Sequence, residues 1–412
     1  MRRFRFLCLL ALLVSTAIVP AGLAYARAAN GPVADTALAT FTSRHYVIHT
    51  NLTRPEVLPF GVHMDSVFDE YLRRFAGFRP RNRKPMDLYI FRTQDDYLTF
   101  MQDHGLNAAN TGGIFFVQPG LQGLATWAEG RPRNVTFATL QHEGFHQFAY
   151  TYLSPQLPTW INEGMAQYFE DGVLVNGAMV VGIINPVRLA IVQKALAAHT
   201  AIDFDEILSI SNEAWNRTLA TDPRRAGLLY DEAWSIVYFL VHADGGRYRP
   251  AFEQMLALVA RGTPVPKAFR TAFGSNDTRA FRQRWESYIS QLKPDPLATT
   301  VERMEMLGQA LAFLHQKNLP TPQTADGLRR ELLRIGYEGR RTRNGITTVL
   351  TGRDVSAFVY PDRQTGVMAF TIVPPAGPDL PPGVAAPSLH PSPTLIWSRD
   401  ANGKLIQDVA YH

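Results

Sequence analysis

The segment LQHEGFHQFAYTYLSPQLPTWINEGMAQYFED, residues 140–171, constrains the fold of this chain more than any other. It carries His142 and His146 four positions apart, with Glu143 beside the first of them. Residues i and i+4 of a helix lie on one face about one turn apart, so both imidazoles can point at one ion. Glu143 lies one step further round, where a base can take a proton from water at that ion. We therefore expect a buried helix with a metal site on one face.

A second helix is expected directly after the first. Pro155 breaks the first helix, and Pro158 precedes Thr159, which we expect to cap a helix that runs to about Asp171. Glu163 lies in the first turn of that second helix. If the second helix folds back on the first, the carboxylate of Glu163 can reach the two histidines.

Zinc fits this set of side chains. A catalytic zinc ion binds three protein ligands and keeps a fourth position open, which His142, His146 and Glu163 would satisfy with one ion. The alternative is that the histidines are merely polar residues of a core-facing helix. The flanking residues Leu140 and Phe145 are apolar, so the helix is expected to be buried, and unpartnered histidines would be costly there. This argument favours the metal site.

The first residues predict an export signal. MRRFR is basic, the apolar run that follows is too short for an ordinary spanning helix, and small residues offer cleavage after Ala26 or Ala28. We expect residues 1–26 to be a secretory signal peptide, the alternative being a retained membrane anchor. The single cysteine, Cys8, lies in this segment, so the mature chain has no disulfide. Such a chain suits a secreted or periplasmic protein of the bacterial envelope.

The composition narrows the range of partners. The 412 residues are 46% hydrophobic and 19% charged, which is typical of a globular chain with two or three domains. The formal net charge of +5 falls by three when the arginines of the signal segment are removed. No basic cluster with interleaved aromatic residues remains, so we expect no nucleic-acid partner. No other apolar run is long enough to span a membrane, so no span is expected after signal removal.

The order of predicted elements indicates an α+β fold. Strands are expected at 45–51, 86–91, 112–118 and 123–128, with helices at 55–77 and 93–105 between them. Further helices are expected at 134–152, 159–171, 186–200, 223–242, 248–261 and 279–292. A small N-terminal sheet should therefore precede an all-helical second part.

A separate C-terminal section is expected after a linker at 293–298. A helical stretch at 299–336 is followed by strands at 346–352, 355–362 and 366–375, a proline-rich loop at 374–393 and a hairpin at 394–411. Residues 299–412 are therefore predicted to form a small mixed α/β accessory region, a partner or substrate module whose role the sequence leaves open.

The motifs HEGFHQF and PTWINEGMAQYFE resemble the gluzincin metallopeptidases. The second motif is similar to the W-L-N-E-G-x-A-x-x-x-E segment of the zinc aminopeptidases of that clan, and the surrounding layout resembles the bacterial peptidase-MA-like proteins. The resemblance implies a zincin-like domain, which we place at residues 43–292. It also implies His142, His146 and Glu163 as zinc ligands and Glu143 as the general base.

The resemblance also implies a tyrosine that stabilises the oxyanion. Tyr230, in LLYDEAWSIVYFL, has a similar helix-start context, although a role in the core is the alternative. The aminopeptidases carry an acid that holds the free amine of the substrate, and TGGIFFVQPG lacks one at the comparable place. An endopeptidase is therefore favoured. Gly112, Gly113 and Ile114 are candidates for pairing with an extended substrate, the alternative being an ordinary edge strand.

A second departure concerns the support of the ligands. Other gluzincins place an aspartate four residues after the ligand glutamate to orient a histidine, and Gln167 occupies that position. Asn162 and Glu170 are further candidates for this role, for which exposure to solvent or helix capping is the simpler expectation.

Together these features predict a secreted zinc-dependent metallopeptidase that cleaves peptides or proteins, including peptides of the cell wall. One alternative is a catalytically silent zincin-like binding module of the envelope, against which the intact Glu143 argues. The other is a structural envelope protein whose histidines are only packed.

Overall fold

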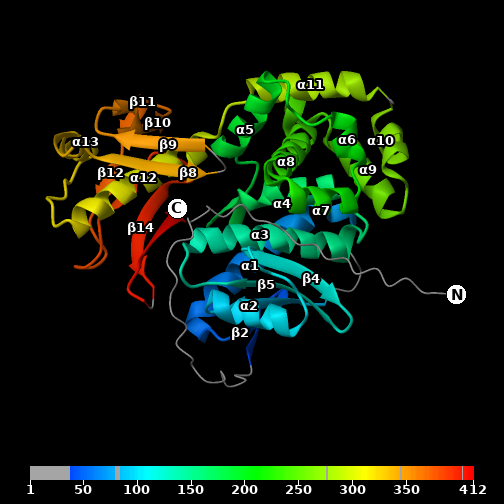
Figure 1. Ribbon diagram of the computed structural model, residues 1–412, viewed down its shortest axis with the longest axis horizontal. Helices are drawn as coiled ribbons and strands as arrows, with labels where there is room; N and C mark the ends of the chain where they lie inside the picture. The colour runs from blue at the N-terminus through cyan, green and yellow to red at the C-terminus, as the bar shows by residue number, and fades with distance from the viewer. Residues whose placement is uncertain (1–37, 79–83, 275–276, 344–345, 401) are drawn as a thin grey trace.

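The computed structural model describes residues 38–78, 84–274, 277–343, 346–400 and 402–412. The chain has the predicted α+β fold, with a small N-terminal sheet, a helical middle and a C-terminal section of helices and strands (Figure 1). The predicted signal peptide, residues 1–26, lies outside the described residues, so it stays a prediction. Within the described ranges, no helix combines the length and the apolar character that a membrane crossing requires.

The N-terminal sheet has five strands in the order β1-β2-β3-β5-β4 (Figure 1). The strands are β1 Ala39–Thr42, β2 Tyr46–Thr50, β3 Met86–Phe91, β4 Gly113–Gln118 and β5 Leu121–Trp127. β2, β3 and β5 run parallel, and β1 and β4 are antiparallel edges. The central strand β3 is almost wholly buried, because helices cover both faces of the sheet. The four predicted strands are confirmed, and β1 is an additional one.

Three helices cover this sheet. Helices α1 Arg54–Arg74 and α3 Arg133–Phe148 belong with Leu88 and Leu124 to the main hydrophobic core. Helix α2, Gln94–Asp103, packs against the opposite face in a smaller aromatic cluster. Figure 1 shows α3 between the sheet and the helical middle. Every residue of α3 from Thr139 to Phe148 is buried, so the predicted metal-binding face lies in the interior.

The helical middle packs on the other side of α3. It consists of α4 Thr159–Glu170, α5 Pro186–Ala197, α6 Phe204–Ser209, α7 Asn212–Thr221, α8 Pro223–Gly246, α9 Arg249–Ala260, α10 Val265–Phe273 and α11 Thr278–Gln291. Helix α8 has non-helical backbone angles at Ala243, Asp244 and Gly245, so its regular part ends where the sequence predicted, at residue 242. Helices α3, α4 and α8 share one core with the sheet.

Several sequence expectations for this part were wrong. The second part is not all-helical, because Val173–Val175 and Ala178–Val180 form a hairpin, β6–β7. Its turn, Asn176-Gly177, has positive φ at both positions and is the sequence signal that was missed. Helices α6, α7 and α10 were also missed, since each is ten residues or shorter. Thr159 does not cap α4: Pro158 is the N-cap, and the Thr159 hydroxyl bonds Asn212 instead.

The C-terminal section has its own hydrophobic core, built from residues 304–397. Its elements are α12 Pro296–Gln316, α13 Ala325–Arg334, β8 Glu338–Arg343, β9 Ile346–Thr351, β10 Val359–Asp362, β11 Gly366–Ala369, β12 Thr371–Val373, β13 Gly383–Ala385, β14 Pro393–Arg399 and β15 Leu405–Tyr411. The expected single helix is two helices, the linker is shortened by the start of α12, and strand β13 interrupts the proline-rich loop. Its independence as a domain stays a prediction.

This section contacts the start of α3. The N-cap residue of α3 is Pro132, which offers no side-chain acceptor. Asp408 on β15 supplies one, because its Oδ1 accepts a hydrogen bond of 3.1 Å from the backbone N–H of Asn134. The negative charge of Asp408 also complements the positive end of the helix dipole. The C-terminal section therefore caps the helix that carries both histidines.

Replacing this cap should destabilise the protein. We expect Asp408→Ala to lower the free energy of unfolding by about 1 kcal/mol, since an orphan N–H and a favourable charge are lost. Urea unfolding followed by circular dichroism measures the change. Asp379→Ala, at an exposed aspartate of the same section, is the matched control. Equal stability of the two variants would contradict the capping role.

A buried acid on α8 makes stability depend on pH. Glu232 is fully buried, and its Oε1 accepts a 3.0 Å hydrogen bond from the N–H of Ile202. Burial raises the pKa of Glu232 to about 8. The unfolded chain releases this proton near pH 4.5, whereas the folded chain keeps it until about pH 8. Stability from this group is therefore present below pH 4.5 and is lost as the pH rises towards 8.

The variant Glu232→Gln removes that titration and keeps an acceptor for Ile202. We expect the stability of Glu232→Gln relative to wild type to rise by on the order of 2 kcal/mol between pH 5 and pH 8. Unfolding curves of both proteins at several pH values test this. A difference in stability that does not change with pH would show that Glu232 is ionised in the folded chain.

Candidate metal centre

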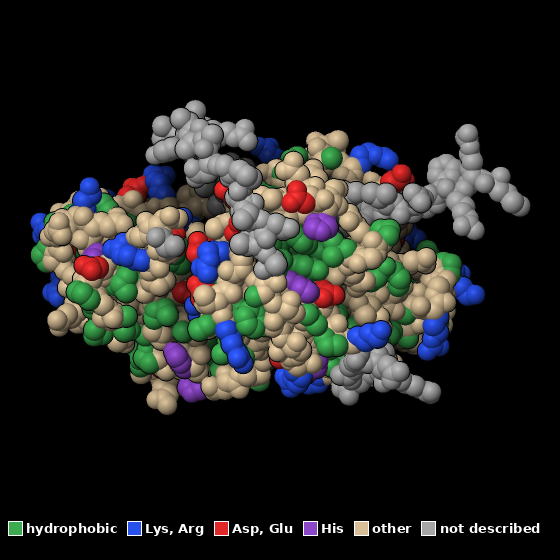
Figure 2. Space-filling model, turned by 90° about the horizontal axis from the view of Figure 1, so that it is seen from below, with side chains coloured by type: hydrophobic (Ala, Val, Ile, Leu, Met, Phe, Trp, Pro, Cys, Tyr) green, Lys and Arg blue, Asp and Glu red, His purple; other side chains and the backbone are tan. Residues whose placement is uncertain are grey.

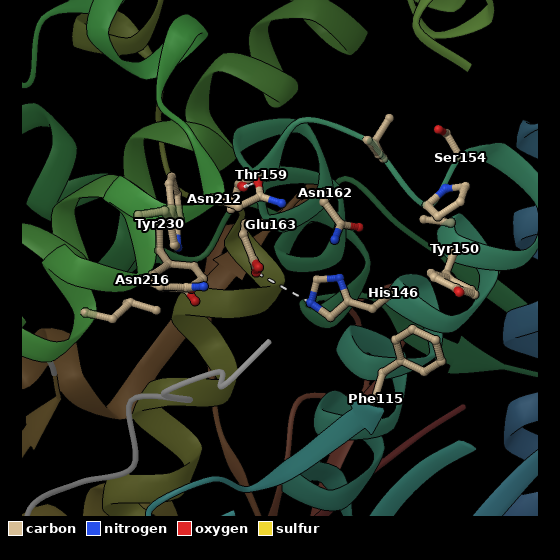
Figure 3. Close-up of a pocket in the computed structure, with 15 residues that line it drawn as sticks. Phe115, His146, Tyr150, Ser154, Thr159, Asn162, Glu163, Asn212, Asn216 and Tyr230 are labelled. Carbon is tan, nitrogen blue, oxygen red and sulfur yellow. Dashed lines mark hydrogen bonds and ion pairs between the residues drawn. The ribbon is translucent and has the colours of Figure 1, made fainter. Parts of the chain in front are cut away.

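Helices α3 and α4 bring together His142, His146 and Glu163. The π-helical turn Ala149–Leu153 and the prolines after it reverse the chain, so α4 packs against α3. The Oε2 atom of Glu163 lies 3.5 Å from Nε2 of His142 and 3.5 Å from Nε2 of His146. Figure 3 shows the carboxylate of Glu163 directed at the imidazole of His146. The convergence that the spacing predicted is therefore present.

The spacing of the three candidate ligand atoms suits a bound metal ion. They all lie within 4.8 Å of one another, and the three side chains are buried. The three ligand atoms themselves, Nε2 of both histidines and Oε2 of Glu163, have no hydrogen-bond partner within the described parts of the chain. Two ligands of a tetrahedral ion with bonds of about 2.0 Å lie about 3.3 Å apart, close to the observed separations. This buried triad could bind a metal ion.

The charges of the triad are already arranged for a cation. Burial alone would raise the pKa of Glu163, but His146 and His142 outweigh this effect and lower it to about 2. Burial alone would lower the pKa of His142, but Glu163 and Glu170 raise it to about 10. The neighbouring carboxylates therefore favour a proton on His142. An ion that bound here would displace this proton, since a ligand imidazole must be neutral.

Glu143 lies beside the triad and is fully buried. Its Oε2 accepts a 2.8 Å hydrogen bond from the backbone N–H of Phe115 on β4. Its Oε1 has no hydrogen-bond partner among the described residues. Burial raises the pKa of Glu143, although His146 and His142 oppose the rise. One oxygen is thus fixed by the sheet, and the other is free to exchange a proton.

Glu170 orients the first histidine. Its Oε2 bonds Nδ1 of His142 at 2.9 Å, and residue i+7 of α4 returns to the face that carries Glu163. A carboxylate on the outer nitrogen fixes the ring and raises its basicity as a ligand. The expectation that Glu170 is solvated or caps a helix was therefore wrong. Gln167, the aligned position, has a buried side-chain oxygen without a partner among the described residues.

Arg188 on α5 holds Glu170 in turn. This buried guanidinium lies 3.6 Å from Glu170, 3.5 Å from Asp171 and 4.0 Å from Asp231. Although burial works in the opposite direction, Arg188 and His142 hold the pKa of Glu170 below its ordinary value. Burial raises the pKa of Asp231 to about 7 despite Arg188. One arginine therefore neutralises the acids behind the metal centre, a role that the sequence did not reveal because Arg188 lies outside the motif.

Tyr230 on α8 lines a small pocket with His146 and Glu163. Glu163 lies between His146 on one side and Tyr230 on the other in Figure 3. The Tyr230 hydroxyl is buried and has no hydrogen-bond partner among the described residues, and the ring makes an edge contact with Trp215. Burial, with Glu163 adding to it, raises the pKa of Tyr230 well above its ordinary value. The hydroxyl therefore keeps its proton.

Close packing of α4 and α8 places Tyr230 near Glu163. A Cβ on Gly164 would lie 2.5 Å from the carbonyl oxygen of Ala233, so only glycine permits this approach. On the other side, Gln141 fastens α3 to the end of α4, because its amide donates to the carbonyl oxygens of Phe169 and Gly172 at 2.6 and 3.0 Å. The residues beside the ligands thus fix the geometry of the centre.

Gly112 and Gly113, at the start of β4, are explained by contacts within the protein. A Cβ on Gly113 would lie 2.7 Å from Thr139 of α3, so this glycine lets the strand approach the helix that carries the two histidines. The carbonyl oxygen of Gly112 already accepts hydrogen bonds from Thr126 and from Arg131. Ile114 is buried in the aromatic cluster. Contacts of Gly112, Gly113 and Ile114 with a substrate stay a prediction.

Comparison with known proteins gives one match. Residues 136–265 match a family model described as a protein of unknown function (DUF1570). The matched segment contains His142, His146, Glu163, Glu170 and Arg188. It runs from the first turn of α3 to the first residue of α10. No curated protein matches this chain.

Removing Arg188 should weaken metal binding. In Arg188→Met, three carboxylates lose their neighbouring cation, so Glu170 favours its protonated form and holds His142 less well. We expect the Zn²⁺ affinity to fall by about tenfold to a hundredfold, as is usual for partners of ligating histidines. Competition with a chelating dye measures it.

Arg282→Met is the matched control, because Arg282 is a surface arginine that pairs with Asp203 and Glu286. It should bind Zn²⁺ like wild type. If Arg188→Met also matched wild type while remaining folded, the network would have no influence on His142.

Proposed function

We propose that the protein is an exported zinc-dependent metallopeptidase of zincin-like fold that cleaves within peptide chains. The observation that carries this proposal is the convergence of three unpartnered ligand atoms, from His142, His146 and Glu163, beside the buried Glu143. Two imidazoles and one carboxylate suit zinc, and a catalytic site of this kind keeps a fourth position open. A bound zinc ion would supply Lewis acidity that acidifies water and polarises a carbonyl group.

The side chains of the chain itself take the remaining roles. Glu143 is the base, since its unbonded oxygen can take a proton from water and pass it to the leaving amine. Burial raises the pKa of Glu143, which makes the carboxylate a stronger base for this exchange. Tyr230 can donate a hydrogen bond to the oxyanion, because its own raised pKa keeps the phenol protonated. Glu170 and Arg188 keep His142 in its orientation.

The free edge of β4 offers a place for the substrate backbone. Residues of an antiparallel strand alternate between bonding the partner strand and pointing away from it. Because the N–H of Phe115 reaches Glu143, the main-chain groups of Phe115 are directed away from β5. By the same alternation, the main-chain groups of Gly113 and Val117 are also directed away from β5. The scissile bond of a peptide added to this edge would lie next to Glu143. The main-chain groups of Gly113 are thus better placed for pairing than those of Ile114.

The side chains on β4 and on the surface bear on the kind of substrate. No acid replaces the amine-binding carboxylate of aminopeptidases on β4, which favours an endopeptidase acting on peptides or proteins, including cell-wall peptides. On the face shown in Figure 2, Lys and Arg side chains are scattered among acidic and hydrophobic ones. The expectation that nucleic acid is not a partner therefore remains part of the proposal, as does export to the periplasm or the medium.

The alternative of a silent binding module is tested together with the activity. We expect Glu143→Gln to lower the rate of peptide cleavage by about a hundredfold or more and to keep one zinc ion per chain. Cleavage of a fluorogenic peptide library and metal analysis of the same samples measure both quantities. Glu253→Gln, at an exposed glutamate on α9, should cleave like wild type.

Two outcomes would overturn the proposal. Zinc-loaded wild type that cleaves no peptide would favour the binding module. Wild type that retains no metal after loading would favour a structural protein with packed histidines.

A further inference from the structure

Trp215 of α7 is a buried tryptophan in the wall of the pocket at the metal centre. It lines this pocket together with Glu163 and Tyr230. It is 1% exposed, and its Nε1 has no hydrogen-bond partner among the described residues. A buried N–H without a partner is costly, so its presence calls for an explanation. Trp160 and Trp234 also carry such an N–H, but of these three indoles only that of Trp215 lines the pocket.

The indole of Trp215 contacts Tyr230. Their ring centroids are 5.1 Å apart and the ring planes meet at 79°, which is an edge contact. The hydroxyl of Tyr230 is also buried and has no hydrogen-bond partner among the described residues. Burial and the charge of Glu163 raise the pKa of Tyr230, whereas the indole N–H of Trp215 lowers it. An N–H lowers the pKa of a phenol by stabilising the phenolate oxygen, so donor and acceptor lie close together without a completed hydrogen bond.

Helix α7 is fastened to the helix that carries Glu163. The hydroxyl of Thr159, the first residue of α4, donates a hydrogen bond to the side-chain oxygen of Asn212, the first residue of α7. Leu219, one turn after Trp215 on α7, is also buried and lines the same pocket. These contacts hold the indole at a fixed place relative to the metal centre.

A donor beside Tyr230 would control the direction of the phenol proton. A hydroxyl can donate one hydrogen bond and accept others, and it rotates to suit its partners. The O–H bond of a phenol lies near the ring plane, so a donor on one side of the oxygen turns the proton to the other side. Hydrogen bonds in such a chain also strengthen one another. Catalytic hydrogen bonds are often long without substrate and tighten when it binds, which fits the incomplete contact between Trp215 and Tyr230.

We propose that the indole N–H of Trp215 donates to the hydroxyl of Tyr230 and turns the phenol proton towards the substrate oxyanion. Trp215 is then a positioning residue, because it acts through Tyr230 and does not bind the substrate itself. The inference rests on the proposed function, in which Tyr230 donates to the oxyanion. It predicts an effect on the chemical step rather than on peptide binding, since the oxyanion develops only on the way to the transition state.

The first test replaces the indole by a ring without an N–H. We expect zinc-loaded Trp215→Phe to cleave a fluorogenic peptide with kcat about tenfold lower and with KM near that of wild type. Trp285→Phe is the matched control, because Trp285 is fully buried on α11 and its N–H bonds Ser235, neither of which lines the pocket. It should keep the kcat of wild type. Metal analysis should find one zinc ion per chain in both variants.

A double-mutant cycle separates positioning from packing. Tyr230→Phe should lower kcat by itself, because the donor to the oxyanion is lost. If the indole acts through the hydroxyl, Trp215→Phe should lower kcat no further in the Tyr230→Phe background. A purely structural role of the indole would lower kcat by the same factor in both backgrounds and would overturn the inference.

Indole NMR signals provide a test in which Trp215 is left unchanged. The proteins compared are wild type and Tyr230→Phe, each loaded with zinc and bound to a phosphinic peptide that mimics the tetrahedral intermediate. One indole N–H signal should lie further upfield in Tyr230→Phe, since the hydrogen bond to the hydroxyl is lost. Identical indole spectra of the two proteins would contradict the inference, even if Trp215→Phe did not fold.

The failures can be told apart. If wild type cleaves no peptide, the proposed function fails and takes this inference with it. If Tyr230→Phe cleaves like wild type, Tyr230 is not the oxyanion donor, and the inference fails while the peptidase remains. If Tyr230→Phe is slow but folded Trp215→Phe has the kcat of wild type, only the inference about Trp215 is wrong.

Discussion

Two imidazoles and one carboxylate converge at the crossing of α3 and α4, and the packing of the surrounding elements holds them there. The Oε2 atom of Glu163 lies 3.5 Å from Nε2 of each histidine, which is close to the spacing of ligands on one ion. The sheet supports α3 from below, α8 packs on α4 through Gly164, and Asp408 caps α3 from the C-terminal section. Each of these contacts acts on the same crossing.

Acidic and basic side chains alternate outward from the crossing. Glu163 faces the two histidines, Glu170 faces the outer nitrogen of His142, and Arg188 faces Glu170. Each carboxylate of this series thus lies next to a histidine or an arginine.

The sequence predicted the parts of the structure that depend on local spacing. The helical pair, the convergence of the three candidate ligands and the strands of the sheet follow from periodicity and from proline breaks, and the α+β class is confirmed. Contacts between distant segments could not be predicted this way. Arg188 and Asp408 contact residues that lie far away in the chain. Glu170 was within reach, since it lies seven residues after Glu163 on the same helical face, but its exposure was misjudged.

The most direct test of the central claim is a zinc titration of wild type and of Glu163→Gln by calorimetry. Because Glu163 comes from a different helix than the two histidines, its contribution tests whether the crossing forms one site. Wild type should bind one zinc ion, and Glu163→Gln, which keeps the size of the side chain, should bind it at least about a hundredfold more weakly. Equal affinities of the two folded proteins, or no binding to wild type, would contradict the account.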